Sequence, residues 1–190
     1  MKKAKFRFLL LGLITLLVFP IPAYLLLNWQ YQITFDDFIQ LENIQLIPIV
    51  YGMQLGFVYA LIILLVLQTP LFKSIPNNIP NIIKKLNLNW TDAIFISFCA
   101  GVGEELLFRV GLQHYLHWVP TSILFIAIHG YLNPWNLKYS LHGLILLPFI
   151  FIISYGYYFF GIWFCIGAHF MYDMIVFLSL INSNEKSVFS

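Results

Sequence analysis

Long apolar runs separated by short polar stretches dominate the chain. A run of about 20 apolar residues is long enough to cross the hydrocarbon core of a bilayer as an α-helix. The sequence predicts such spans at about 6–27, 44–68, 90–117, 141–160 and 161–181. A further apolar run, 120–132, would extend only about 18 Å as a helix, so we expect a short or irregular fourth segment. The predicted fold is all-α, a polytopic membrane helix bundle of about six transmembrane segments.

The first span begins like a signal peptide, with a basic segment before an apolar run. The run continues past Pro20 and Pro22, and no small-residue cleavage pattern follows it. We therefore expect an uncleaved first span that is kinked at the two prolines. The connector 69–89 contains several lysines and prolines, and its apolar residues are spaced for an amphipathic helix at the membrane surface.

These segments predict one structural domain with three parts. Residues 1–89 form an N-terminal transmembrane pair with the amphipathic connector, residues 90–182 form a helical core, and residues 183–190 form a polar tail. The composition agrees, because 61% of residues are hydrophobic and only 9% are charged, whereas soluble domains average about 25% charged. The formal net charge of +2 gives no reason to expect a nucleic-acid partner. Cys99 and Cys165 both lie in predicted spans, so we expect buried thiols rather than a disulfide.

The basic residues outside the spans predict the orientation of the chain. They lie in the N-terminus, the 69–89 connector, the loop that contains Lys138 and the tail. With six crossings these segments share one side, which the positive-inside rule places in the cytoplasm together with both termini. Counting along the third span then places its acidic residues nearer the opposite face, so this topology predicts a site that opens to the outside.

Two carboxylates and an arginine lie within the third span, and ionisable groups at membrane depth suggest function. Glu105 and Arg109 are four residues apart, so on a helix they form an ion pair on one face. Glu104 lies about 100° around the helix and is not committed to that arginine. One carboxylate can therefore be structural and the other chemical. The alternative is a buried salt bridge that holds helices together without any chemistry.

Histidines in two other apolar runs fall at a similar depth. Helical rise places Glu104 about 20 Å into its span, while His129 and His169 lie about 14 and 12 Å from the opposite face. Asp173 follows His169 by four residues and shares its face. Three separate segments thus bring ionisable side chains to one level, which structural polar residues have no need to do.

A carboxylate and a neutral imidazole can hold and deprotonate a water molecule, and a second histidine can donate a hydrogen bond to an oxyanion. This combination is suited to hydrolysis of an amide bond inside the bilayer. Glu104, His129 and His169 could equally bind a zinc ion that carries the water. The chain has no His-Glu-x-x-His sequence, so the usual two-histidine helix of zinc proteases is not predicted.

Three motifs occur in order within apolar runs: Glu104-Glu105-x-x-x-Arg109, Phe125-x-x-x-His129 and His169-x-x-x-Asp173. Together they resemble the signature of the CPBP family, which includes CAAX prenyl endopeptidases of the Rce1 type and bacteriocin-processing or immunity proteins called Abi proteins. The resemblance covers about 90–181, half of the chain.

The resemblance implies an intramembrane endopeptidase in a bacterial cell membrane, with a peptide or protein substrate held at the lipid bilayer. Glu104 and His129 would activate water, while His169 and Asp173 would bind the oxyanion, or Asp173 would orient His169. Glu105, Arg109 and Phe125 would support the site. The last motif position is often Asn in the family, and an ionised Asp173 cannot donate to an oxyanion. Members are described both as zinc enzymes and as metal-free glutamate enzymes, so the cofactor stays open.

Two other functions fit the same residues. A non-catalytic membrane immunity or partner-binding protein would keep the polar cluster for stability. An ion pathway through Glu104, Glu105 and Asp173 is weaker, because the second span offers only Gln54 as a continuation toward the other face.

Overall fold

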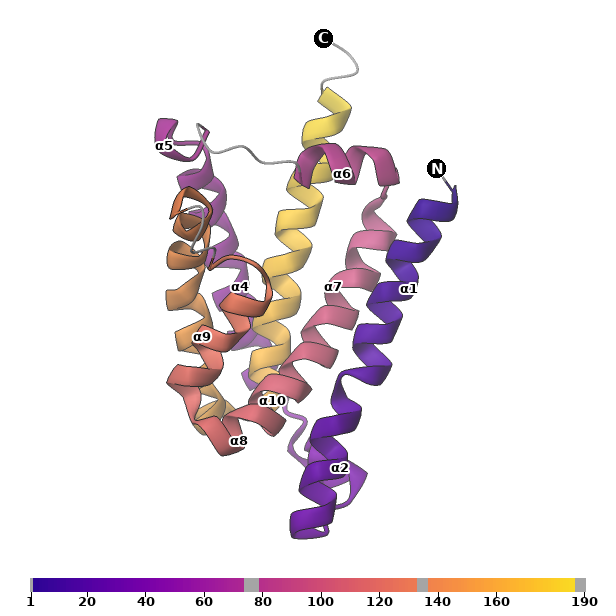
Figure 1. Ribbon diagram of the computed structural model, residues 1–190, viewed down its shortest axis with the longest axis vertical. Helices are drawn as coiled ribbons and strands as arrows, with labels where there is room; N and C mark the ends of the chain where they lie inside the picture. The colour runs from indigo at the N-terminus through magenta and orange to yellow at the C-terminus, as the bar shows by residue number, and fades with distance from the viewer. Residues whose placement is uncertain (1, 74–78, 133–136, 187–190) are drawn as a thin grey trace.

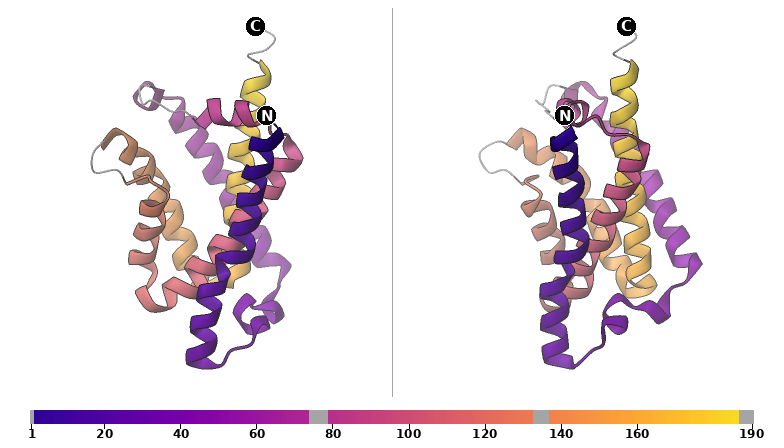
Figure 2. Two further views of the ribbon diagram at one scale, coloured as in Figure 1. Left: turned by 45° about the vertical axis from the view of Figure 1, so that its right-hand side comes forward. Right: turned by 90° about the vertical axis from the view of Figure 1, so that its right-hand side faces the viewer.

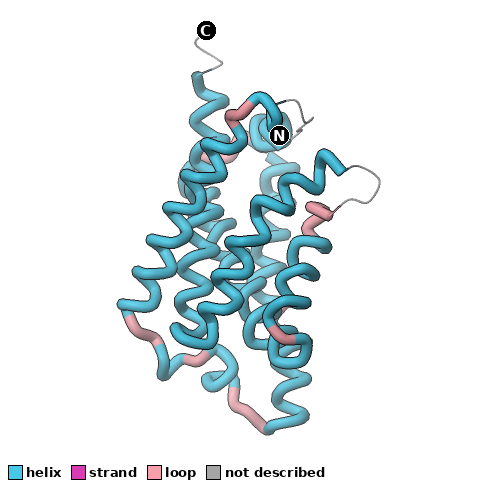
Figure 3. Tube along the Cα trace, turned by 90° about the vertical axis from the view of Figure 1, so that its left-hand side faces the viewer, coloured by secondary structure: helices cyan, strands magenta, loops and turns pink. Residues whose placement is uncertain are grey.

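The computed structural model describes residues 2–73, 79–132 and 137–186 of the chain. Regular structure in these ranges is entirely helical, which confirms the all-α prediction. Most helices lie along the long axis of the molecule (Figure 1), and short loops join them (Figure 3). Three of the described stretches are long and apolar enough to cross a membrane: Lys2–Tyr31, Leu46–Leu67 and Ser140–Asn182. The chain therefore has the architecture of a polytopic helical membrane protein.

The predicted first span consists of α1 (Lys2–Val18) and α2 (Pro20–Tyr31). The two helices are separated at Phe19, directly before Pro20, because proline has no N–H to donate to the preceding turn. A polar connection with the short helices α3 (Phe35–Ile39) and η1 (Leu41–Asn43) leads to the second span.

The second span is α4 (Leu46–Leu67), and it packs directly on the backbone of α10 (Leu137–Lys186). A Cβ atom added at Gly52 or Gly56 would lie only 2.1 Å from a carbonyl oxygen of α10. Small residues allow this close approach, as they do at many interfaces between membrane helices. The position of α10 is thus set by backbone contact with α4.

Helix α10 contains both of the last two predicted spans. It is broken at Gly161, whose φ of 73° and ψ of −174° favour glycine. The arms before and after this residue lie side by side, and the Cys165 thiol of the second arm donates to the Ile153 carbonyl of the first at 3.3 Å. In Figure 1 the first arm is orange and the second is yellow. Both cysteines are free and buried, as predicted.

The predicted third span consists of α7 (Trp90–Glu105), the π-helical segment η2 (Leu106–Leu112) and α8 (Gln113–Leu116). Asn89 and Asp92 form a capping box at its start, and Lys5 of α1 pairs with Asp92 at 2.5 Å. The π-helical segment was not predicted. It begins directly after Glu105, and π-helical turns are frequent at functional sites.

The predicted short fourth segment is α9 (Trp118–Ile128), with only 11 residues. It lies beside the first arm of α10 at one side of the bundle (Figure 2). The connector forms α5 (Pro70–Lys73) and α6 (Ile79–Leu86). Ile83 and Leu86 of α6 are buried against α1 and α10, whereas Lys84 and Lys85 are exposed. The helix is therefore amphipathic, and its position at a membrane surface stays a prediction.

The beginning of α1 and the end of α10 lie at the same end of the molecule, together with α6 (Figure 1). This arrangement agrees with the even number of crossings that the sequence predicts. Residues 133–136 of the loop before α10 and residues 187–190 of the polar tail lie outside the described ranges. The membrane face at which the termini lie stays a prediction.

Candidate active site

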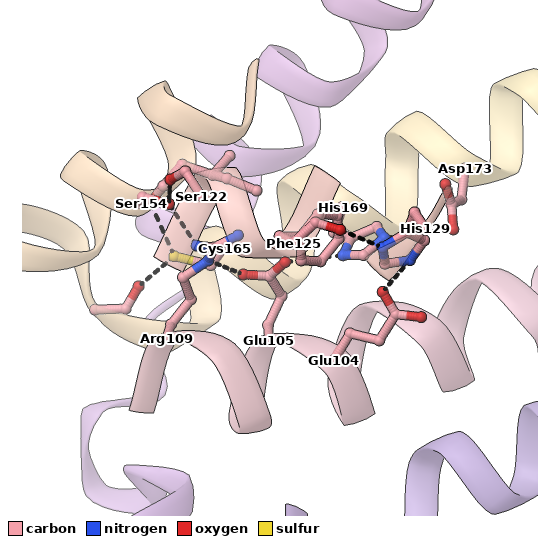
Figure 4. A network of polar contacts seen from close by, with 12 residues as sticks. Glu104, Glu105, Arg109, Ser122, Phe125, His129, Ser154, Cys165, His169 and Asp173 are labelled. Carbon is pink, nitrogen blue, oxygen red and sulfur yellow. Dashed lines mark hydrogen bonds and ion pairs between the residues drawn. The ribbon is translucent and has the colours of Figure 1, made fainter. Parts of the chain in front are cut away.

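Side chains from three parts of the chain meet inside the bundle (Figure 4). The third span, α9 with the residue that follows it, and the second arm of α10 each contribute ionisable groups. The predicted site residues that contact one another here are Glu104, Glu105, Arg109, Phe125, His129, His169 and Asp173. The equal depths counted along the sequence therefore correspond to real proximity.

The inner part of this cluster is closed to solvent. The side chains of Glu105 and Arg109 are 0% exposed, and Arg109 Nε donates to Glu105 Oε2 at 2.7 Å, which confirms the predicted i,i+4 pair. The second carboxylate oxygen, Oε1, lies 2.9 Å from His169 Nδ1. Glu105 thus connects Arg109 to the histidine, a contact that the sequence did not reveal.

The network continues from Arg109 into residues outside the predicted set. Arg109 Nη1 donates to Ser154 Oγ on the first arm of α10. Ser154 Oγ lies 2.7 Å from Ser122 Oγ on α9, and Gln113 Nε2 donates to the Ser154 carbonyl at 2.8 Å. Nothing in the sequence distinguishes Ser154 from other small polar residues in apolar spans, so this position was missed.

The outer part of the cluster is held more loosely. Glu104 Oε2 lies 3.2 Å from His129 Nε2, and the two side chains are 13% and 30% exposed. Glu104 Oε2 is itself buried and accepts no hydrogen bond from any residue that the structure describes. The exposed part of the pair therefore lies on other atoms of the two side chains.

The backbone fixes the tautomer of His129. Its Nδ1 atom lies 2.7 Å from the Phe125 carbonyl oxygen, which only accepts hydrogen bonds. Nδ1 must therefore carry the proton, so in the neutral ring Nε2 is an acceptor, whereas in the imidazolium ion it donates to Glu104. With the ring neutral, a carboxylate oxygen and an imidazole nitrogen, both acceptors, converge on one point. One water molecule has the two donors that such a pair needs.

His169 lies between two carboxylates. Nδ1 contacts Glu105, and Nε2 lies 3.5 Å from Asp173 Oδ2 in the i,i+4 arrangement that the sequence predicts. A histidine can donate to acceptors on both nitrogens only as the imidazolium ion. The Nε2 contact is long for a hydrogen bond, so this N–H can donate to another acceptor placed beside it.

Phe125 separates the two parts of the cluster. Its buried ring stacks on His129 with centroids 4.3 Å apart, and its edge-on contact with the His169 ring is 5.8 Å. The Arg109 guanidinium carbon lies 5.5 Å from the same ring centroid. Phe125 therefore supports both histidines and limits the space around them.

Exposure of the cluster rises toward the end of the molecule that carries the termini. Arg109 and Glu105 are 0% exposed, His169 is 8% and Asp173 is 23%. On α10, Asp173 is nearer than His169 to the C-terminal end of the helix, which lies at the terminal end of the bundle (Figure 1). The more exposed side chains of the cluster thus lie toward the end of the molecule that carries the termini, and the side on which the site opens stays a prediction.

The residues present do not form the zinc site considered from the sequence. Among the described residues, no group of three or more His, Cys, Asp and Glu side chains is arranged to hold a metal ion. The predicted ligand His169 instead has a carboxylate beside each ring nitrogen, Glu105 at Nδ1 and Asp173 at Nε2. We therefore derive no step through a metal.

Comparison with known proteins finds one similarity to a protein family. Residues 86–175 match the family model described as type II CAAX prenyl endopeptidase Rce1-like, and the matched region contains every predicted site residue. The same comparison with curated proteins and with solved structures gave no match. The family description implies a protease of the CAAX type, and the apolar helices place it in a membrane. Residues 86–175 of this chain are thus similar to the Rce1-like type II CAAX prenyl endopeptidases, which supports the resemblance seen in the sequence.

Proposed function

We propose that this protein is an intramembrane endopeptidase in which Glu104 and His129 activate the attacking water. The observation that carries the proposal is the convergence of two acceptors, Glu104 Oε2 and His129 Nε2, 3.2 Å apart at the accessible side of a buried polar network. One water bound there donates one O–H to each acceptor and keeps its lone pairs for attack. General-base assistance of this kind accelerates hydrolysis by about 10²–10⁴-fold.

The remaining residues suit the later steps. As the water oxygen bonds to the peptide carbonyl carbon, Glu104 takes a proton and the carbonyl oxygen becomes an oxyanion. His169 Nε2–H, held only loosely by Asp173, donates to this oxyanion. When the C–N bond breaks, the proton on Glu104 passes to the leaving amine nitrogen. Glu105 and Arg109 hold the His169 ring in place throughout.

The proposed substrate is a peptide that an apolar anchor holds at the membrane. The family description favours a CAAX-like peptide, and bacteriocin leaders are a second class. The accessible side of the cluster faces the end of the bundle with the exposed Lys84 and Lys85. By the positive-inside rule this end, with both termini, lies in the cytoplasm of a bacterial cell. A reporter active only in the cytoplasm, fused after Ser190, checks this orientation.

The test uses the full chain purified in detergent and a set of lipid-anchored peptides. Wild type is compared with Glu104→Ala and His129→Ala, with and without a chelator. We expect both variants to lose at least about 10²-fold in kcat/KM while unfolding at nearly the wild-type temperature, and we expect cleavage to survive the chelator. Glu42→Ala is the matched control, because this carboxylate is exposed in the short helix η1 between α3 and α4.

Each other outcome points to a different function. Full activity in Glu104→Ala would disprove glutamate-activated water. Loss of cleavage to the chelator with recovery on adding zinc would assign a metal instead. A non-catalytic immunity or partner-binding protein predicts that the variants lose function only as far as they lose abundance.

A further inference from the structure

A chain of hydrogen bonds leads from the proposed active site to the backbone of α9 (Figure 4). Its direction is fixed by chemistry. Arginine only donates, so Arg109 Nη1–H donates to Ser154 Oγ. Ser122 Oγ–H donates to the Trp118 carbonyl at 2.7 Å, so Ser122 must accept from Ser154 at 2.7 Å. Each hydroxyl thus accepts one hydrogen bond and donates one.

Ser154 is the point at which three helical segments are joined. Its side chain connects Arg109 of η2 with Ser122 of α9, and its carbonyl accepts from Gln113 at the start of α8. Ser154 itself lies on the first arm of α10 and is 0% exposed. The arms of α10 meet at Gly161, and the second arm carries His169. One serine therefore contacts the segments on either side of the proposed site.

Arg109 depends on this serine for its orientation. Its side chain is fully buried, and among the described residues only Glu105 and Ser154 accept its hydrogen bonds, whereas Nη2 has no partner. With Nε bound to Glu105 and Nη1 bound to Ser154, the planar guanidinium has one position. That position places Arg109 on Oε2 of Glu105 and leaves Oε1 for His169 Nδ1.

We propose that Ser154 is a positioning residue of the peptidase, which acts through Arg109 and Glu105 to hold His169 where it stabilises the oxyanion. The proposal rests on the proposed function, because it concerns the transition state of that reaction. Ser154 does not contact the substrate. Its removal is therefore expected to lower kcat and to leave KM unchanged.

The experiment compares Ser154→Ala with Ser97→Ala in detergent-purified full-length protein. Both serines are 0% exposed, but Ser97 Oγ has no hydrogen-bond partner among the described residues. We expect Ser154→Ala to lose about 10- to 100-fold in kcat, as a small displacement of a catalytic group does. Its KM is expected to stay near that of Ser97→Ala, which keeps wild-type kinetics. Its unfolding temperature is expected to fall below that of Ser97→Ala, because the buried Nη1 of Arg109 loses its acceptor.

Two further variants keep the proposal open to refutation. Ser154→Thr retains the hydroxyl and is expected to recover most of the lost kcat. Ser122→Ala removes the acceptor of Ser154, so its effect and that of Ser154→Ala must be less than additive in the double variant. If Ser154→Ala does not accumulate, normal kcat in Ser122→Ala overturns the proposal.

The outcomes separate this proposal from the proposed function. Ser154 has no positioning role if folded Ser154→Ala keeps the wild-type kcat. The same conclusion follows if kcat and the unfolding temperature fall together and Ser154→Thr recovers neither. Activity that persists in Glu104→Ala would instead refute the glutamate mechanism itself, whatever Ser154 does.

Discussion

Glu104 and Glu105 are neighbours in sequence but lie in opposite environments. Glu105 is 0% exposed and contacts both Arg109 and His169 at 2.9 Å or less. Glu104 is 13% exposed and faces only His129, an acceptor, at 3.2 Å. The rotation of about 100° between successive helical residues separates them. A buried carboxylate with strong donors is a stable anion, whereas one without a donor can still take a proton.

The comparison indicates that two neighbouring glutamates in one helical turn have different roles. In the inner network both carboxylate oxygens of Glu105 have nitrogen partners, Arg109 and His169, and Arg109 connects the pair to Ser154. In the outer pair, Glu104 Oε2 accepts no hydrogen bond from the described residues. Reactivity is therefore expected at the carboxylate that lacks a donor, and stability at the carboxylate whose oxygens are both paired.

The largest expected effect is the difference in stability between alanine substitutions of the two glutamates. Glu105→Ala leaves Arg109 buried without its counter-charge, which costs about 3–5 kcal/mol. Glu104→Ala removes an acceptor that has no donor, and this is neutral or stabilising. Thermal unfolding in detergent and abundance in membranes measure both variants. Equal destabilisation by the two substitutions would contradict the division between inner and outer residues.

The second prediction concerns a substitution that displaces the backbone of α10 next to His169. A Cβ at Gly56 would lie 2.1 Å from the carbonyl oxygen of Ala168, the residue before His169. Gly56→Ala must therefore push α4 and α10 apart, at a cost of about 1–3 kcal/mol, and we expect kcat to fall with the displacement of His169. Gly12→Ala is the control, because its Cβ meets its nearest atom at an ordinary 3.6 Å. Similar unfolding temperatures for the two variants would show that α10 is not held by this contact.

Several features of the fold and site could be predicted from the sequence. Apolar run length identified the helices, and the i,i+4 spacing identified the Glu105–Arg109 pair and the neighbours His169 and Asp173. These predictions depend on local geometry, which spacing determines directly. The meeting of His129 with Glu104 followed from depth alone, because a membrane orders its helices along one axis.

Other features depend on rotation and packing, which spacing does not determine. The pattern of apolar residues does not indicate the π-helical segment after Glu105. The contact between Glu105 and His169 requires two helices to face each other at a given rotation, and Ser154 resembles any small polar residue of an apolar span. Depth also does not show which side of a cluster is covered, so the direction of access stays a prediction.

A third, smaller effect is expected at the ring that lies between the two regions. Phe125→Leu removes the stacking on His129 at 4.3 Å. Aromatic pairs contribute about 0.5–1.5 kcal/mol, so we expect a loss of up to about tenfold in kcat/KM. Phe98→Leu makes the same change at a side chain of α7 that is 48% exposed and is expected to have no effect. Steady-state cleavage rates measure both, and equal rates for the two would remove Phe125 from the site.

The smallest effect is expected at Asp173, at the outer edge of the cluster. Its contact with His169 Nε2 is 3.5 Å long and its side chain is 23% exposed, so the pair is weakly coupled. Exposed ion pairs contribute about 0.2–1 kcal/mol, which limits the expected loss in Asp173→Asn to about fivefold in kcat. An Asn amide keeps the shape of the side chain and gains an N–H that can donate to the oxyanion, while Asp173→Ala loses both. The ratio of kcat values for the two variants therefore measures which role the position has. If Asp173→Asn were as inactive as Glu104→Ala, the carboxylate of Asp173 would itself take part in proton transfer. The groups that react would then include a residue of α10, and the contrast between Glu104 and Glu105 alone would not separate reacting groups from supporting ones.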